Sequence, residues 1–206
     1  MEQIISIDKS VFWWINSHHS GWLDWTMWTF SQPFSWLIVI LLVYILVTLR
    51  KDRRNWLWVL VGIGFCFLLA DQISNEAIKE GVQRLRPCYE LDGVRMFRTG
   101  KGGQYGFVSS HAANAFAVAM FLSLLYGGER KTENEKPGAK IENHKNAVIP
   151  YVMFAWAAIV CYSRAYLGKH YPGDIVCGAL LGLGVGATVY FVISSIRRRI
   201  VSKSAE

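Results

Sequence analysis

Residues 175–196 read IVCGALLGLGVGATVYFVISSI, an uncharged apolar run that is long enough to cross a bilayer as a helix, which takes about 20 residues. Four more apolar segments occur along the chain: 34–49, 55–70, 112–126 and 147–162. A single such run can be a buried helix of a soluble protein, but five within 206 residues leave too little polar surface to cover them. The sequence therefore predicts an all-α, polytopic membrane helix bundle.

The composition favours the same class. Hydrophobic residues make up 52% of the chain and charged residues 18%, whereas a typical soluble domain has roughly 45–50% and about 25%. These proportions argue against an ordinary soluble enzyme, a disordered regulator and a nucleic-acid-binding domain, and the net charge of +7 is attributed to the membrane rather than to DNA. The length suits one membrane-embedded domain, 1–206, and the scattered cysteines form no CxxC or Cys/His cluster that would indicate a disulfide or metal site.

The N-terminal segment, 1–30, is rich in tryptophan but also contains polar residues such as Asn16 and Asp24. Tryptophan collects where lipid meets water, so this segment is expected to form a helix in the headgroup region. A short sixth crossing that starts near Trp25 is the alternative, which gives five to six transmembrane helices. The opening sequence MEQIISIDKS lacks the pattern of a cleavable signal peptide.

The loops between the apolar segments sort onto two sides of the membrane. The side that carries 50–54, the polar loop 129–146 and the tail after Ile196 holds most of the 22 Lys and Arg residues. By the positive-inside rule this side is cytoplasmic. We therefore expect a multi-pass protein of the inner (plasma) membrane, whose loops at 80–110 and 164–174 face the periplasm or exterior.

The outward side also collects polar residues that are costly near a bilayer. The helical pattern of the second segment continues past Ala70 to Lys79, and Arg86 lies about two turns further on. If that helix continues until Pro87 stops it, both cations point to one side. With Arg164 they form three positive groups suited to phosphate oxygens, unless they are unrelated residues that snorkel to lipid headgroups.

Two histidines stand near helix starts on this side. Ser109, Ser110 and His111 precede an Ala-rich helix whose free N–H groups can bind an anion, although a plain N-cap with an incidental histidine is the simpler interpretation. His170 and Asp174 flank a Tyr-Pro-Gly turn. If Asp174 accepts a hydrogen bond from one ring nitrogen of His170, the other nitrogen is left as a nucleophile or base. One histidine can then attack while the other donates a proton, and no HExxH pattern points to a metal instead.

Three linked motifs lie within 79–174. They read Lys79-EGVQRL-Arg86-Pro87, then VSSH at 108–111, then Ser163-Arg164-AYLGK-His170-YPG-Asp174. This order resembles the signature K-x6-RP, PSGH, SR-x5-H-x3-D of the type 2 phosphatidic acid phosphatase family, in the acid phosphatase and vanadium haloperoxidase superfamily. The first and third motifs match throughout, whereas Val108 and Ser110 replace the proline and glycine of the second.

The resemblance implies a metal-independent phosphatase that uses no cofactor. By matched position, His170 is the nucleophile that forms a phosphohistidine, Asp174 orients it, and His111 protonates the leaving group. The resemblance also implies five residues that hold the substrate phosphate: Lys79, Arg86, Ser109, Ser110 and Arg164. Arg84 lies outside the signature and is interpreted as a headgroup contact.

The expected substrate is a lipid phosphate, because the site opens at the membrane–water boundary. An outward site favours undecaprenyl diphosphate or a lipid A phosphate, and phosphatidylglycerol phosphate and phosphatidate are the alternatives within the family. The expected partners are membrane lipids, not nucleic acid. A transporter of anions or lipids is the alternative of another class, but it would need polar groups throughout the membrane, and the third and fifth segments contain few.

Overall fold

The computed structural model describes residues 2–49, 56–127 and 148–203, so the predicted loop at 129–146 and the basic run at 50–54 lie outside the described residues. The described part of the chain is all-helical, as predicted, apart from one isolated bridge between Leu85 and Tyr105. In chain order the elements are α1 (Glu2–Ser17), α2 (Gly21–Ser31), α3 (Phe34–Leu49), α4 (Trp56–Gln72), the π-helix η1 (Ile73–Lys79), α5 (Glu80–Val82), α6 (Pro87–Glu90), α7 (Ser110–Tyr126), α8 (Val148–Tyr166) and α9 (Pro172–Lys203).

All five predicted apolar segments are helices, namely α3, α4, α7, α8 and α9. Among the described residues, three helical stretches are long and apolar enough to cross a membrane: Trp56–Val82, Val148–Tyr166 and Pro172–Ile200. The apolar helix α7 is shorter, and α3 has 16 residues. The chain is therefore an α-helical membrane protein, while the number of five to six crossings stays a prediction.

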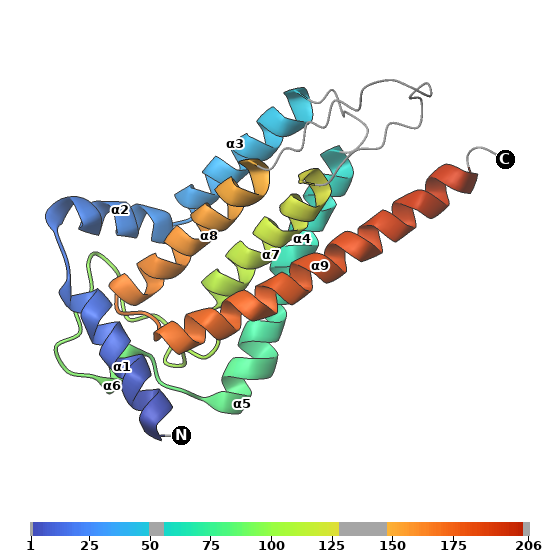
Figure 1. Cartoon of the computed structure of the whole chain (residues 1–206). Coiled ribbons are helices and arrows are strands. Elements are labelled where there is room, and N and C mark those ends of the chain that lie inside the picture. The colour runs from blue at the N-terminus through green and yellow to red at the C-terminus, as the bar shows by residue number, and fades with distance from the viewer. Residues whose placement is uncertain (1, 50–55, 128–147, 204–206) are drawn as a thin grey trace.

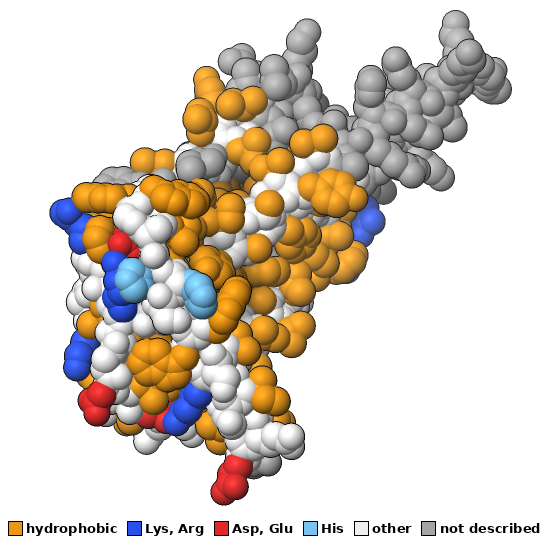
Figure 2. All heavy atoms as spheres, turned by 60° about the vertical axis from the view of Figure 1, so that its left-hand side comes forward, with side chains coloured by type: hydrophobic (Ala, Val, Ile, Leu, Met, Phe, Trp, Pro, Cys, Tyr) orange, Lys and Arg blue, Asp and Glu red, His pale blue; other side chains and the backbone are white. Residues whose placement is uncertain are grey.

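Figure 2 shows hydrophobic side chains along the visible flank of the bundle, with most of the charged side chains gathered at one end. The exposed apolar residues of α4 include Leu57 and Phe65, and those of α9 include Leu180 and Phe191. A lipid-facing surface requires this distribution, because hydrocarbon tails offer no partner for polar groups.

The helix α7 lies at the centre of the bundle, in contact with α4, α8 and α9 (Figure 1). Its buried surface is rich in alanine, and Gly178, Gly182 and Gly186 of α9 recur at intervals of four residues against its backbone. Small residues at such spacing let two helices approach closely in a membrane. This approach places the starts of the two helices side by side, where the Ser109 N–H donates to the Asp174 carbonyl at 3.0 Å.

The N-terminal segment forms two helices, α1 and α2, rather than one. Both lie at the end of the bundle where α9 begins (Figure 1), and α2 packs on α8 while α1 contacts α8 and α9. The exposed side chains of α1 include Ile4, Ile7 and Trp14, and those of α2 include Trp22 and Trp25. A helix in the headgroup region must expose apolar side chains beside polar ones, and this distribution is consistent with such a location. The location itself stays a prediction.

The expected continuous helix from Lys79 to Pro87 is wrong. The helix ends at Val82, because Gln83 adopts a left-handed conformation (φ 51°) and Arg86 is extended. Pro87 begins α6 instead of ending the long helix, and a residue before proline disfavours the helical conformation. Lys79 and Arg86 therefore approach the site from a helix and from a loop, not from one helical face.

Candidate active site

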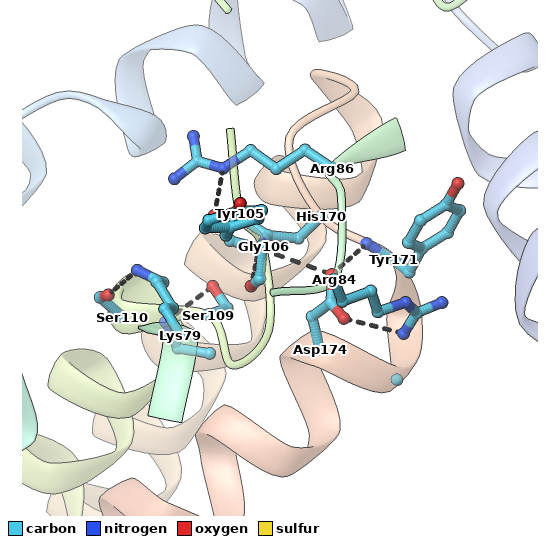
Figure 3. A network of polar contacts seen from close by, with 12 residues as sticks. Lys79, Arg84, Arg86, Tyr105, Gly106, Ser109, Ser110, His170, Tyr171 and Asp174 are labelled. Carbon is cyan, nitrogen blue, oxygen red and sulfur yellow. Dashed lines mark hydrogen bonds and ion pairs between the residues drawn. The ribbon is translucent and has the colours of Figure 1, made fainter. Parts of the chain in front are cut away.

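Figure 3 shows six of the candidate catalytic and phosphate-binding residues close together: Lys79, Arg86, Ser109, Ser110, His170 and Asp174. They come from four places in the chain: the end of η1, the loop before α6, the start of α7, and the segment from the end of α8 to the start of α9. Within the described ranges no group of three His, Cys, Asp or Glu side chains could hold a metal ion. The site is therefore built from histidines, cations and helix starts.

His170 lies in the turn between α8 and α9 and is 2% exposed. Its Nδ1 lies 2.9 Å from the Gly106 carbonyl, which can only accept, so Nδ1 carries the proton and donates it. The lone pair is then on Nε2. The expected hydrogen bond to Asp174 is absent, since the Nδ1–Oδ2 distance is 3.7 Å. A backbone carbonyl, rather than the carboxylate, selects the ring tautomer.

Burial lowers the pKa of His170 well below its ordinary value, and the positive charges of Arg164, Arg86 and Lys79 lower it further. The three predicted phosphate-binding cations thus lie close enough to the imidazole to disfavour its protonation. A neutral imidazole with a free Nε2 is the form that can attack an electrophile.

Asp174 is wholly buried in the first turn of α9. Its Oδ2 accepts the Tyr171 N–H at 3.0 Å, which caps the helix in the manner of a capping box, and Pro172 at the first helical position reinforces that start. Its Oδ1 accepts a hydrogen bond from Arg84 at 2.8 Å. Asp174 therefore fixes the turn that carries His170 and remains within ion-pair distance of the ring.

Lys79 reaches the start of α7. Its Nζ donates to Ser110 Oγ and to Asn75 Oδ1, both at 2.5 Å, and Ser110 in turn donates to Asn75 at 3.0 Å. Ser109 acts as the N-cap, because its side chain accepts the Ala112 N–H. Ser109 and Ser110 thus lie at the predicted site, where their side chains organise the helix start and the lysine.

The guanidinium groups of Arg86 and Arg164 form no ion pair with a carboxylate in the described part of the chain. Arg86 Nε donates to the Tyr105 carbonyl at 3.0 Å, and burial lowers its pKa. Arg164 is 6% exposed, donates from Nη1 to Ser31 Oγ at 2.5 Å, and has no partner for its Nε among the described residues. Buried cations that lack a countercharge favour an anionic ligand.

His111 follows Ser110 in the first turn of α7 and is partly exposed. Its ring lies close enough to Arg164 and His170 for their charges to interact. Both histidines therefore belong to one site, one buried and one reachable from solvent.

Two contributors, Gly106 and Lys169, were not predicted from the sequence, and a third, Arg84, has other partners than expected. Gly106 contributes its backbone carbonyl, and no pattern of residue types in the sequence indicates that role. Arg84 does not point to a headgroup but to carboxylates, and its two-residue distance from Arg86 was the only signal. Lys169 is 5% exposed and donates to the Gly100 carbonyl; burial, with Arg164 and Arg86 nearby, lowers its pKa to about 8. Its position directly before His170 is a signal that could have found it.

A buried histidine near cations that form no ion pair among the described residues, in an apolar helix bundle, is typical of a membrane enzyme that handles phosphate. Residues 60–198 match the PAP2 superfamily, and the chain belongs to it. It is 30% identical to the lipid A 4′-phosphatase of Bacteroides thetaiotaomicron over 98% of this chain and 84% of that protein, and 27% identical to that of Porphyromonas gingivalis over 97% and 78%.

The fold is similar to that of a PAP2-type phosphatidylglycerolphosphate phosphatase from Bacillus subtilis, with a TM-score of 0.65 and 21% identity over 97% of this chain and 89% of that one. The family predicted from the three motifs is confirmed. The protein is a membrane lipid phosphatase.

Proposed function

We propose that the protein removes a phosphate from lipid A or a related lipid, without a metal, through a phosphohistidine formed on His170. The observation that carries this proposal is the state of His170: its Nδ1 donates to the Gly106 carbonyl, which leaves the lone pair on Nε2, and three cations lie nearby. An undecaprenyl diphosphate is the second candidate substrate, because the same site chemistry suits a lipid diphosphate.

In the proposed first step, Nε2 of His170 forms a bond to phosphorus as the bond from phosphorus to the lipid oxygen breaks. Protonated His111 gives its proton to that oxygen. In the second step, His111 takes a proton from a water molecule whose oxygen attacks phosphorus. The N–P bond breaks, its electron pair returns to Nε2, and inorganic phosphate leaves.

Lys79, Arg86 and Arg164, with the N–H groups at the start of α7, would stabilise the charge on the phosphate oxygens. A pentacoordinate phosphorus concentrates negative charge, so loss of one cation is expected to raise the barrier by on the order of 3 kcal/mol, as for a lost oxyanion donor. Asp174 would oppose the positive charge that His170 gains when Nε2 is phosphorylated.

Two features support the choice of substrate. Two relatives that match nearly the whole chain in sequence are lipid A 4′-phosphatases. The site also lies at the end of the bundle opposite the basic end of α9, which the positive-inside rule assigns to the cytoplasm (Figure 1). An active site that faces the periplasm or exterior would meet lipids of the outer leaflet.

Phosphate release by the purified full-length protein in detergent tests this proposal. The substrates are lipid A, undecaprenyl diphosphate, phosphatidylglycerol phosphate and phosphatidate, each with a chelator present. We expect the highest kcat/KM with lipid A, no loss with the chelator, and no turnover by His170→Ala. His18→Ala, at an exposed position in the link between α1 and α2, is the matched control and should retain activity. Turnover by His170→Ala would contradict the mechanism, and a preference for another lipid would contradict the substrate.

A further inference from the structure

The N-terminal helix α1 contacts the start of α9, next to His170, through the carboxylate of Asp8. Asp8 Oδ1 accepts the Gly173 N–H at 2.7 Å, at the start of α9. Asp8 Oδ2 accepts a hydrogen bond from Arg84 Nη2 at 2.6 Å. A Cβ at position 173 would lie 2.9 Å from Asp8 Oδ2, so a larger residue there would push the Asp8 carboxylate aside.

Arg84 connects Asp8 with Asp174. Its Nη1 donates to Asp174 Oδ1 at 2.8 Å, and its guanidinium lies over the ring of Tyr171, 4.3 Å from the centroid (Figure 3). Because the other oxygen of Asp174 lies 3.7 Å from His170 Nδ1, the chain Asp8, Arg84, Asp174, His170 is continuous.

The buried carboxylate of Asp174 needs this cation. An ionised carboxylate removed from water costs several kcal/mol unless a countercharge and hydrogen bonds compensate it. Arg84 is the arginine or lysine that forms an ion pair with Asp174 in the described part of the chain. Without it, the carboxylate would have to turn away or take up a proton, and the negative charge beside the phosphorylated imidazole would be lost.

We propose that Arg84, held in place by Asp8 of α1, is a positioning residue that keeps the Asp174 carboxylate behind His170. Through this contact, full activity depends on the docking of the N-terminal helix. The inference rests on the proposed role of His170 as nucleophile.

A second contact of α1 provides a comparison, because it reaches Asp174 through Tyr171 and not through an ion pair with Arg84. Lys9 forms an ion pair with Glu90 whose side chains are about one-third exposed, and Glu90 accepts a hydrogen bond from the Tyr171 hydroxyl at 2.7 Å. Lys9→Gln therefore loosens α1 by one ion pair while the Asp8–Arg84–Asp174 contacts stay intact.

Steady-state kinetics of Arg84→Gln, Arg84→Lys, Asp8→Asn and Lys9→Gln test the proposal. For Arg84→Gln we expect kcat to fall by about tenfold or more with little change in KM, by analogy with outer partners of metal-bound histidines. Arg84→Lys should restore part of kcat. Asp8→Asn should lower kcat less, and should add nothing in the Arg84→Gln background, since Asp8 acts through Arg84.

Two results would overturn the proposal. A raised KM with unchanged kcat in Arg84→Gln would make Arg84 a headgroup ligand and overturn the proposal. An equal loss of kcat in Lys9→Gln and Asp8→Asn would assign the effect to docking of α1 in general, and would also overturn it. If Arg84→Gln does not fold, Arg84→Lys and Asp8→Asn decide the question alone. His170→Ala, measured in parallel, separates failure of the nucleophile from failure of this contact.

Discussion

Because the imidazole of His170 is buried, its protonation changes the free energy of unfolding. Its pKa in the folded protein is lowered by burial and by the nearby cations, whereas in the unfolded chain it is about 6.5. Its contribution to stability is therefore present above pH 6.5 and is lost as the pH falls below 6.5, because only the unfolded chain then binds the proton readily. Thermal unfolding in detergent between pH 7.5 and 5 should show a smaller loss of stability for His170→Asn than for the wild type. His18→Asn should behave as the wild type, and equal pH dependence in all three would contradict the prediction.

Lys169 predicts a second pH dependence. Its pKa of about 8 means that it loses its charge in mildly alkaline solution, unlike an exposed lysine. Because it lies near Arg86 and Arg164, its charge should help to attract the lipid phosphate. We expect KM to rise above pH 8 in the wild type but not in Lys169→Arg, whose guanidinium stays charged. Arg198→Gln, at an exposed position on the far end of α9, controls for the loss of a charge elsewhere. An unchanged KM for Lys169→Gln at pH 7 would contradict this role.

At the residue scale, the side chains of the three motifs could be predicted from the sequence, whereas the Gly106 carbonyl, the partners of Arg84 and the position of Lys169 could not. His111, His170, Asp174 and the three cations stand in a spacing that brings them to one side of a helix bundle. The partner of His170 was predicted to be Asp174, but Gly106 takes that place. Every residue has a backbone carbonyl, so the sequence does not indicate which one will accept the hydrogen bond from His170. The path of the loop decides this, and tertiary packing determines that path.

At the element scale, the close packing of α9 against α7 positions the two helix starts that carry the site. A Cβ on Gly182 would overlap the backbone of α7 at Ala113 and Ala117, whereas nothing lies within 4 Å of a Cβ on Gly184. Gly182→Ala should therefore destabilise the protein by about 1–3 kcal/mol, as overpacking does. Gly184→Ala should be neutral or stabilise it by up to about 1 kcal/mol, because alanine is the better helix former. Thermal unfolding in detergent compares the two, and equal melting temperatures would contradict the packing.

The apolar pattern of the sequence predicts the helices of the bundle but does not predict where the second helix ends. The apolar segments predicted the five helices of the bundle, because each has a long run of residues that must avoid water. The end of the second helix was misplaced, since polar residues from Lys79 to Arg86 suit a helix or a loop equally well. Gln83 ends the helix with a left-handed conformation that its residue type does not require. In the loop that follows, Arg84 donates to Asp174, whereas Arg86 donates to the Tyr105 carbonyl.

At the scale of the whole molecule, the apolar flank and the charged end give the protein a defined depth in the membrane. The site lies at the end where α9 begins, and the basic residues Arg197, Arg198 and Arg199 lie near the other end of the same helix. A helix of 32 residues spans about 48 Å, more than the hydrocarbon core of a bilayer. We therefore expect the two ends of α9 to lie on opposite sides of the membrane, with the candidate active site and the C-terminal basic cluster in different compartments.

This separation predicts which surface positions react with a membrane-impermeant maleimide in spheroplasts. Ser17 is exposed at the end of α1, which lies at the end of the bundle where α9 begins (Figure 1), and Ser202 is exposed near the end of α9. Ser17→Cys should be labelled from outside, while Ser202→Cys should be labelled only after the membrane is permeabilised, because the positive-inside rule keeps the basic end in the cytoplasm. The wild-type chain sets the background, since Cys66, Cys88 and Cys161 are buried and Cys177 is partly buried. The reverse pattern would place the active site in the cytoplasm and would exclude a lipid of the outer leaflet as its substrate.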